Sequence, residues 1–309
     1  MKLPVTHGHV LHYAEFGNPT GIPLLFVHGG PGSACHPAQA QWLYPQGFRI
    51  IQLDQRGCGQ STPQGGLLGN HPVNLLLDME ALRQHLGITR WVIYGGSWGA
   101  TLALEYAKQY PAQVSALLLR GAFLARQDDW EWFSLSHGVA QQFPAAYHAL
   151  LHTLKPTAGE NPLNSLYRHI HNPRIRPEQA YRYALAWDAW ECAVMGLPAP
   201  VFNPDASTWQ PRINSTRIYS HYCYQQFFLP AQGVMQGLEA LRTLPVMLVH
   251  GLHDYVCRYA SAVLLAQHLP NSQLISVDAG HGMHEPRLQQ ALLQAAIALH
   301  GNLLPTQRR

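Results

Sequence analysis

The chain has 309 residues, enough for one large α/β domain or for a domain that carries a sizeable insertion. Its hydrophobic fraction of 47% is that of an ordinary globular protein, while its charged fraction of 12% lies well below the usual value of about 25%. The formal net charge of +3 includes no basic block apart from the terminal Arg308-Arg309, which argues against a nucleic-acid partner.

The cysteines and the hydropathy pattern predict where the protein is found. The five cysteines, at positions 35, 58, 192, 223 and 257, are widely spaced and include no Cys-x-x-Cys pair, as expected for reduced thiols. The first residues lack the apolar core of a signal peptide, and no run approaches the roughly 20 apolar residues of a membrane span. We therefore expect a soluble, cytoplasmic protein without a membrane partner.

Short apolar runs alternate with helical patterns in the first third of the chain. Strands are predicted over residues 23–27, 49–53, 91–94 and 114–119, and helices over residues 75–86 and 101–108. Alternating strands and helices are typical of a parallel sheet that is covered by helices on both faces.

The pattern changes after Phe123. Residues 124–240 are rich in Trp, Tyr, His and Pro, and contain helical stretches such as 180–193 but no convincing buried strand. The strand pattern returns at residues 245–250 and 273–277, and a closing helix is predicted over residues 288–299. We therefore expect one α/β catalytic domain, made of residues 1–123 and 241–309, with a helical lid, residues 124–240, inserted in it.

Ser97 lies in the strongest functional motif of the chain, the sequence Gly-Gly-Ser-Trp-Gly at residues 95–99. A predicted strand precedes this motif and a helical pattern follows it. Strand, Gly-x-Ser-x-Gly and helix in this order describe a nucleophile elbow, which exposes one serine hydroxyl at a sharp turn. Because a serine is a weak nucleophile by itself, the chain must also supply a base and an oxyanion site.

Asp254 and His281 are the candidate acid and base, because each follows a predicted strand. The order Ser97, Asp254, His281 is that of α/β-hydrolases and differs from the orders of the other two serine-hydrolase folds. Alternative residues stand nearby in the sequence: His253 and His284 as bases, and Asp278 and the pair Asp128-Asp129 as acids. Asp254 has the better spacing, and only His281 follows both a strand and a glycine turn.

Two glycine-rich loops follow the first two predicted strands. In residues 28–32, His-Gly-Gly-Pro-Gly, the backbone can approach a bound carbonyl, so Gly29 or Gly30 and the amide of Trp98 are the candidate oxyanion donors. The loop at residues 54–61 lacks the Gly-Lys-Ser/Thr of a phosphate site, and we interpret its Asp54 and Arg56 as a structural pair that shapes the neighbouring oxyanion loop.

Together with the segments 78–83, 119–123 and 254–257, these motifs resemble the proline iminopeptidase (prolyl aminopeptidase) family of α/β-hydrolases, nearly end to end. The combination of Gly-Gly-Pro-Gly with Gly-Gly-Ser-Trp-Gly is far more specific than the elbow alone. The resemblance implies an α/β-hydrolase fold with a lid. It also implies release of N-terminal proline from peptides, without a metal or organic cofactor.

The resemblance also implies a set of substrate-binding residues. Residues 187–191, Trp-Asp-Ala-Trp-Glu, resemble the lid motif, so Glu191 is expected to hold the substrate amine and Trp190 to lie beside it. Phe123 and Cys257 match family positions near the substrate. Tyr219 stands where the family usually carries a second glutamate, and a phenol supplies no negative charge at neutral pH.

Three functions therefore follow from the sequence. The first is a Ser-His-Asp aminopeptidase that acts on small peptides with an N-terminal proline. The second keeps the chemistry but acts on a small neutral ester, amide or lactone, because Tyr219 removes one anchor for an amine. The third is a non-catalytic binding protein on a hydrolase fold. An aspartate-nucleophile hydrolase is disfavoured, because the elbow carries Ser97.

Overall fold

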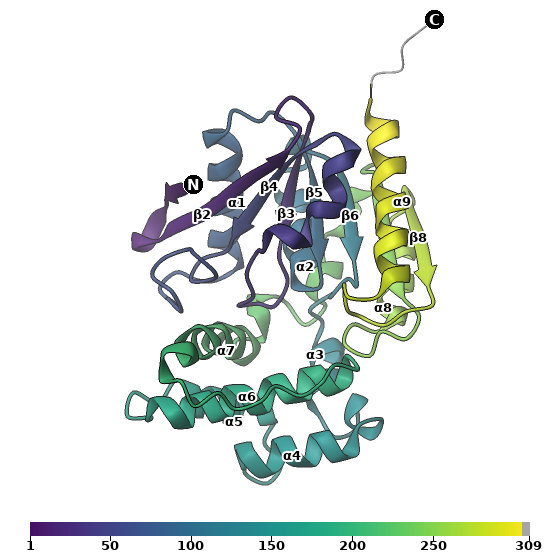
Figure 1. Cartoon of the computed structure of the whole chain (residues 1–309). Helices are drawn as coiled ribbons and strands as arrows, with labels where there is room; N and C mark the ends of the chain where they lie inside the picture. The colour runs from purple at the N-terminus through teal and green to yellow at the C-terminus, as the bar shows by residue number, and fades with distance from the viewer. Residues whose placement is uncertain (305–309) are drawn as a thin grey trace, which may run out of the picture.

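A twisted sheet of eight strands forms the centre of the molecule in the computed structural model, which describes residues 1–304 (Figure 1). The terminal Arg308-Arg309 pair lies outside the described residues. The strands are β1 (Lys2–Pro4), β2 (Val10–Gly17), β3 (Ile22–Val27), β4 (Phe48–Asp54), β5 (Trp91–Gly96), β6 (Val114–Arg120), β7 (Val246–Gly251) and β8 (Ser272–Val277).

The strand order is β1-β2-β4-β3-β5-β6-β7-β8. From β4 to β8 all neighbours are parallel, whereas β2 pairs antiparallel with both β1 and β4. The chain crosses to the β4 side after β3 and then returns to the other side with β5. The loops that follow β3 and β5 therefore lie next to each other at a topological switch point, where ligands bind in open α/β sheets.

Helices cover both faces of the sheet, as the alternating pattern predicted. One face packs against α1 (Pro72–His85), α2 (Trp98–Gln109) and α8 (Tyr259–His268), and the other packs against α9 (Pro286–Leu303). The central strands β3, β5, β6 and β7 are mostly apolar because both of their faces are buried. The predicted α/β-hydrolase fold class is confirmed.

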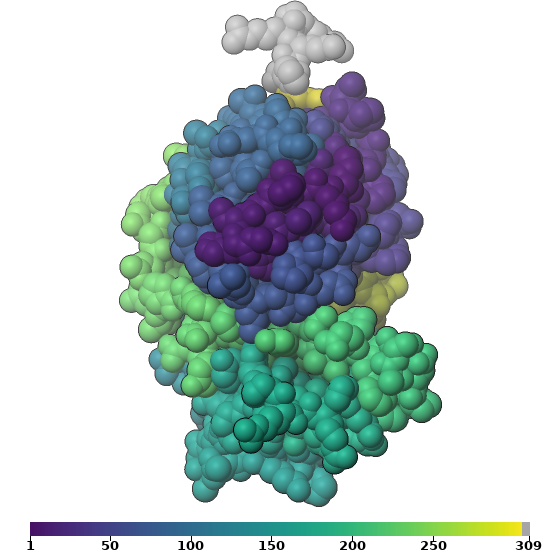
Figure 2. Space-filling view, turned by 90° about the vertical axis from the view of Figure 1, so that its left-hand side faces the viewer, coloured from purple at the N-terminus to yellow at the C-terminus, as the bar shows by residue number. Residues whose placement is uncertain are grey.

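Residues 124–240 contain five α-helices and several 3-10 turns, and we call them the helical segment. Its helices are α3 (Gln127–Ser134), α4 (Pro144–Leu154), α5 (Pro162–Ile170), α6 (Pro177–Val194) and α7 (Trp209–Tyr224). Figure 1 shows α4 to α7 stacked below the sheet, and Figure 2 shows the helical segment as the lower part of the molecule. Helix α7 packs against α5 and α6.

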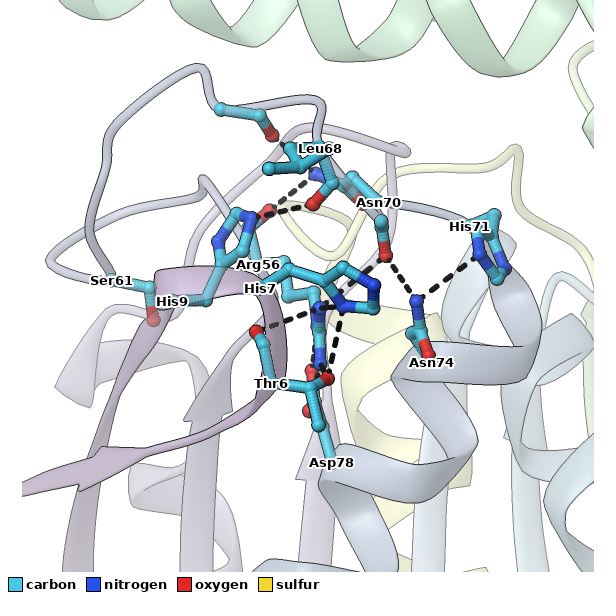
Figure 3. Close-up of polar contacts among 12 residues, drawn as sticks. Thr6, His7, His9, Arg56, Ser61, Leu68, Asn70, His71, Asn74 and Asp78 are labelled. Atoms are coloured by element: carbon cyan, nitrogen blue, oxygen red, sulfur yellow. Dashed lines mark hydrogen bonds and ion pairs between the residues drawn. The ribbon is translucent and has the colours of Figure 1, made fainter.

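The buried guanidinium of Arg56 holds the loop that joins β4 to α1. Arg56 donates two hydrogen bonds to Asp78, of 2.5 and 2.7 Å, and one of 2.7 Å to the hydroxyl of Thr6 (Figure 3). We expected Arg56 to pair with Asp54, and this expectation is wrong: the acidic partner of Arg56 is Asp78. Asp54 instead accepts backbone N–H bonds from Cys35 and Gln60, so the structural role of both residues holds.

Candidate active site

A cavity of about 470 Å³ lies between the carboxyl edge of the sheet and the helical segment. The sheet side contributes Ser97, His281 and the glycines of the loop after β3. Helices α6 and α7 contribute Glu191 and Tyr219. The remaining wall includes seven aromatic residues, Phe26, Tyr94, Phe123, Trp130, Phe133, Trp187 and Phe227. The structure therefore brings most of the predicted site residues to one enclosed space.

Ser97 occupies the turn between β5 and α2 in a backbone conformation that side-chain-bearing residues rarely adopt. Its φ is 56° and its ψ is −122°, and its N–H donates to the Arg120 carbonyl oxygen at 2.9 Å. The nucleophile elbow predicts this kind of strained turn. Its hydroxyl lies 3.9 Å from the sulfur of Cys257 and lines the cavity.

Asp254 and His281 form a buried pair beside the cavity. The Nδ1 of His281 lies 2.7 Å from the Oδ2 of Asp254, and the other carboxylate oxygen accepts the backbone N–H groups of Val256 and Cys257 at 3.0 and 2.8 Å. Burial opposes ionisation of Asp254, but the His281 charge and these hydrogen bonds outweigh it, so the pKa of Asp254 lies below its ordinary value.

Gly121 gives the imidazole of His281 the space it occupies. A Cβ at Gly121 would lie 3.0 Å from Cε1 of the ring and 3.3 Å from the Oδ2 of Asp254, and its φ is +51°. Any larger residue at this position would therefore displace the pair. Arg120, the preceding residue, donates to the His281 carbonyl oxygen at 2.6 Å, which ties the loop after β8 to the end of β6.

Three of the alternative acids and bases, Asp129, Asp278 and His253, form ion pairs outside the cavity. Asp129 pairs with Arg126 and Arg258, and Asp278 is exposed on the surface, where it pairs with His253. His284 lines the cavity, and a Cβ at Gly282 would clash with its ring. Of the candidate acids, Asp254 is the one bonded to His281.

Gly29 brings the loop after β3 close to the nucleophile elbow. A Cβ at Gly29 would lie 3.0 Å from the Gly96 carbonyl oxygen and 3.4 Å from the Cβ of Ser97. Trp98 begins α2, so its backbone N–H has no acceptor within the helix. Gly29 and Gly30 line the cavity beside Ser97. The geometry therefore offers amides from two sides of the elbow.

Glu191 extends from α6 into the cavity, where Trp187 and Tyr219 lie close to its carboxyl group. Burial raises the pKa of the Glu191 carboxyl to about 7, and the nearby indole N–H of Trp187 opposes the rise only in part. A carboxyl group in such surroundings gains from the arrival of a cation. Glu191 is therefore suited to hold a positively charged group in the cavity.

Tyr219 lies in the cavity, with its ring 5.3 Å from that of Trp187 between centroids. Burial, with a smaller effect of Cys223 and Glu191, raises its pKa well above the ordinary value, so the phenol is neutral. Asp188, which the sequence reasoning did not single out, also lines the cavity one turn before Glu191. Its carboxylate pairs with Arg212 of α7.

Phe123 and Cys257 line the cavity, as the resemblance implied. Trp190 does not line it: its indole N–H donates to the Phe133 carbonyl oxygen at 3.2 Å, and its ring is buried between helices of the helical segment. The expectation of a substrate contact for Trp190 is wrong because its neighbour on the helix, Trp187, faces the cavity instead.

Known proteins match nearly the whole chain. A family model described as alpha/beta hydrolase fold matches residues 22–288. A Leptolyngbya boryana protein named "Probable proline iminopeptidase" is 36% identical over 95% of this chain and 91% of its own length. Proline iminopeptidases of Xylella fastidiosa and of Neisseria meningitidis are 36% and 33% identical, over 95% and 98% of this chain and 94% and 96% of theirs. The chain belongs to the proline iminopeptidase family.

Solved structures agree on the fold. A carboxylesterase structure from Nitrososphaera gargenis has a TM-score of 0.63 at 17% identity and covers 98% of this chain and 99% of its own. An esterase of Exiguobacterium antarcticum has a TM-score of 0.61 at 18% identity, over 97% of this chain and 98% of its own.

Within residues 1–304, no helix combines the length and apolar character needed to cross a bilayer.

Proposed function

We propose that this member of the proline iminopeptidase family is a serine aminopeptidase that releases proline from the amino terminus of small peptides. Its identity of 33–36% to several proteins of that name supports the activity. The cavity supports it as well, because a hydroxyl, an imidazole and an unpaired carboxyl group border one space of about 470 Å³. The reaction uses Ser97 as the nucleophile, His281 as the base and Asp254 as the group that orients it.

The first half-reaction forms a prolyl ester on Ser97. Asp254 accepts a hydrogen bond from the Nδ1–H of His281. The proton stays on Nδ1, so Nε2 is the nitrogen that takes the Ser97 proton as the hydroxyl oxygen attacks the scissile carbonyl. Backbone amides of Trp98 and of Gly29 or Gly30 stabilise the resulting oxyanion. The carbon–nitrogen bond then breaks, and the leaving amine takes its proton from His281.

The second half-reaction releases proline. A water molecule gives a proton to His281 and attacks the ester carbonyl through the same oxyanion site. The bond to Ser97 then breaks, and the serine oxygen recovers a proton from His281. The same three side chains therefore serve both steps, with no net change in the enzyme.

Substrate selection is assigned to the helical segment, which acts as a lid over the carboxyl edge of the sheet. The ring nitrogen of an N-terminal proline is positively charged, and Glu191 is the unpaired carboxyl group of the cavity wall contributed by α6. An ion pair between them forms in surroundings of low polarity and positions the scissile carbonyl on Ser97. The aromatic wall contacts the apolar part of the ring.

The observation that carries this proposal is the meeting of Ser97 and Glu191 in one cavity although 94 residues separate them in the sequence. Its test is the hydrolysis of proline p-nitroanilide by the purified wild-type protein and by Ser97→Ala. We expect turnover by the wild type and none by the variant. Full activity of folded Ser97→Ala would contradict the proposal.

Tyr219 favours a second candidate function, hydrolysis of a small neutral ester, amide or lactone. Its phenol is neutral and adds no charge beside Glu191. Rapid cleavage of p-nitrophenyl butyrate with hardly any cleavage of proline p-nitroanilide would favour this candidate. Failure of a fluorophosphonate probe to label Ser97 in the folded protein would instead favour a non-catalytic binding protein.

We also infer that the protein works in the cytoplasm on small peptides, without nucleic-acid or membrane partners. All five cysteines are free thiols, which supports a reducing compartment. Mass spectrometry of the protein purified without reductant tests this inference. Five alkylatable thiols are expected, and a stable disulfide would contradict it.

A further inference from the structure

A turn of unusual backbone conformation follows helix α7. Three consecutive residues that are not glycine, Gln226, Phe227 and Phe228, have φ values of 49°, 56° and 55°. Residues with a Cβ seldom adopt this left-handed region, and they do so singly far more often than in a row. Such strain persists where the surrounding structure imposes it, and it is concentrated at functional sites.

The side chains of the two phenylalanines in this turn lie in different surroundings. Phe227 is buried, with its ring centroid 5.7 Å from that of Trp98 and 4.9 Å from that of Phe123, and it lines the cavity. Phe228 is 40% exposed and packs against His71 and His221 at 5.9 and 5.3 Å. Only the first ring therefore faces the space in which a substrate would bind.

The contacts of Phe227 join the helical segment to the nucleophile. Trp98 follows Ser97 directly, and Phe123 lies three residues beyond the end of β6. Phe227 thus extends from the end of α7 to the sheet side of the cavity and occupies volume beside the elbow. A group held covalently on Ser97 would share this volume with the Phe227 ring.

We propose that Phe227 determines specificity by limiting the size of the acyl group that can bind beside Ser97. A compact ring such as that of proline fits beside it, whereas a long or bulky acyl group is excluded. The size limit requires only that Ser97 is the nucleophile, and the link to proline rests on the proposed function. The strained turn is the means by which the lid places this ring against the elbow.

The experiment compares Phe227→Ala, Phe227→Trp and the matched control Phe228→Ala, which alters the same turn outside the cavity. The substrates are p-nitrophenyl acetate and octanoate, with the p-nitroanilides of proline and leucine. For Phe227→Ala we expect the octanoate-to-acetate ratio of kcat/KM to rise about tenfold or more, and the leucine-to-proline ratio to rise likewise. Phe227→Trp should lower both ratios, and Phe228→Ala should leave them within about twofold.

Equal changes for all substrates, or the same ratios in both phenylalanine→alanine variants, would overturn the proposal and leave Phe227 a packing residue. Melting temperatures of the three variants identify any loss of fold. If Phe227→Ala does not fold, Phe227→Trp still tests the size limit through the opposite change. If the wild type cleaves the esters but not proline p-nitroanilide, the proposed function fails, while the ester ratio still tests Phe227.

Discussion

Asp254 and Glu191 are carboxyl groups on opposite sides of the cavity, the first buried and the second half-buried, and their pKa values are shifted in opposite directions. Asp254, at the sheet, is held ionised by His281 and two backbone N–H groups, so its pKa lies below the ordinary value. Glu191, on α6, has a pKa raised to about 7 by burial. Asp254 already has its hydrogen-bond partners in the structure, whereas the proposed role of Glu191 requires a cation that the substrate brings.

Loss of the nucleophile should give the largest effect. Ser97→Ala removes the attacking oxygen, so we expect turnover of both ester and anilide substrates to fall by a factor of about 10⁴ or more. Circular dichroism and the melting temperature should match the wild type, because the substitution removes one atom that faces the cavity. A variant that keeps ester hydrolysis while losing anilide hydrolysis would show that the two reactions use different nucleophiles.

Replacing the Glu191 carboxylate by a neutral amide should slow hydrolysis of a charged substrate much more than hydrolysis of a neutral ester. For Glu191→Gln we expect kcat/KM for proline p-nitroanilide to fall about 100-fold, because the substrate ammonium loses its partner in surroundings of low polarity. Hydrolysis of p-nitrophenyl acetate should stay within a fewfold of the wild type. The matched control is Asp188→Asn, one turn away, whose charge is already paired with Arg212, so the effect should stay below about tenfold.

The difference between the two carboxyl groups should also be visible in the pH dependence. As the pH falls below about 7, Glu191 takes up a proton and loses its charge. The ratio of kcat/KM for proline p-nitroanilide to that for p-nitrophenyl acetate should then fall by up to about tenfold per pH unit. Because both substrates use the same base, the ratio isolates the effect of Glu191. In Glu191→Gln the ratio should not change with pH.

The two carboxyl groups should change the free energy of unfolding with pH in opposite directions. The folded pKa of Glu191 lies above its ordinary value, so the folded state binds more protons between about pH 4.5 and 7, and the free energy of unfolding decreases as the pH rises through this range. Glu191→Gln should therefore be more stable than the wild type at pH 8 by about 1 to 3 kcal/mol, and by much less at pH 4.5.

For Asp254 the folded pKa is lowered, so its stabilising contribution is present above the ordinary pKa and is lost as the pH falls through the folded value. Asp254→Asn should thus be less stable than the wild type at pH 7. Urea titrations of both variants and the wild type at pH 4.5 and 8 measure these differences. Stabilisation by Asp254→Asn at pH 8 would refute the contrast between the two groups.

The sheet and the sheet side of the site could be predicted from the sequence because both have local patterns. Central strands buried on both faces appear as short apolar runs, and polar residues that follow such runs meet at one edge of a parallel sheet. Ser97, Asp254 and His281 were selected in this way, and the structure bonds Asp254 to His281 and places Ser97 at the turn between β5 and α2. Strand β2, which lies between β1 and β4, was missed because it has no continuous apolar run. Its buried residues Leu11 and Tyr13 alternate with residues that are only partly buried.

The lid side could be predicted only in part, because contacts between helices decide which side chains face the cavity. Trp187 and Trp190 stand one turn apart, and only the packing of α6 on its neighbours directs the first inward. The position of the Phe227 ring depends on a turn with left-handed backbone conformation. The sequence does not predict this turn, because no glycine stands there. The pairing of Arg56 with Asp78 depends on where α1 begins relative to the loop, which the sequence pattern does not fix.

The most direct test of the account compares proline p-nitroanilide with cyclopentanecarboxylic acid p-nitroanilide, which keeps the ring and lacks the charged nitrogen. In the wild type we expect kcat/KM for the proline compound to exceed that for the carbocycle by about 100-fold, because Glu191 binds the ammonium. In Glu191→Gln the two values should come within about tenfold of each other. A wild-type ratio near one, or a ratio that the substitution leaves unchanged, would contradict the account.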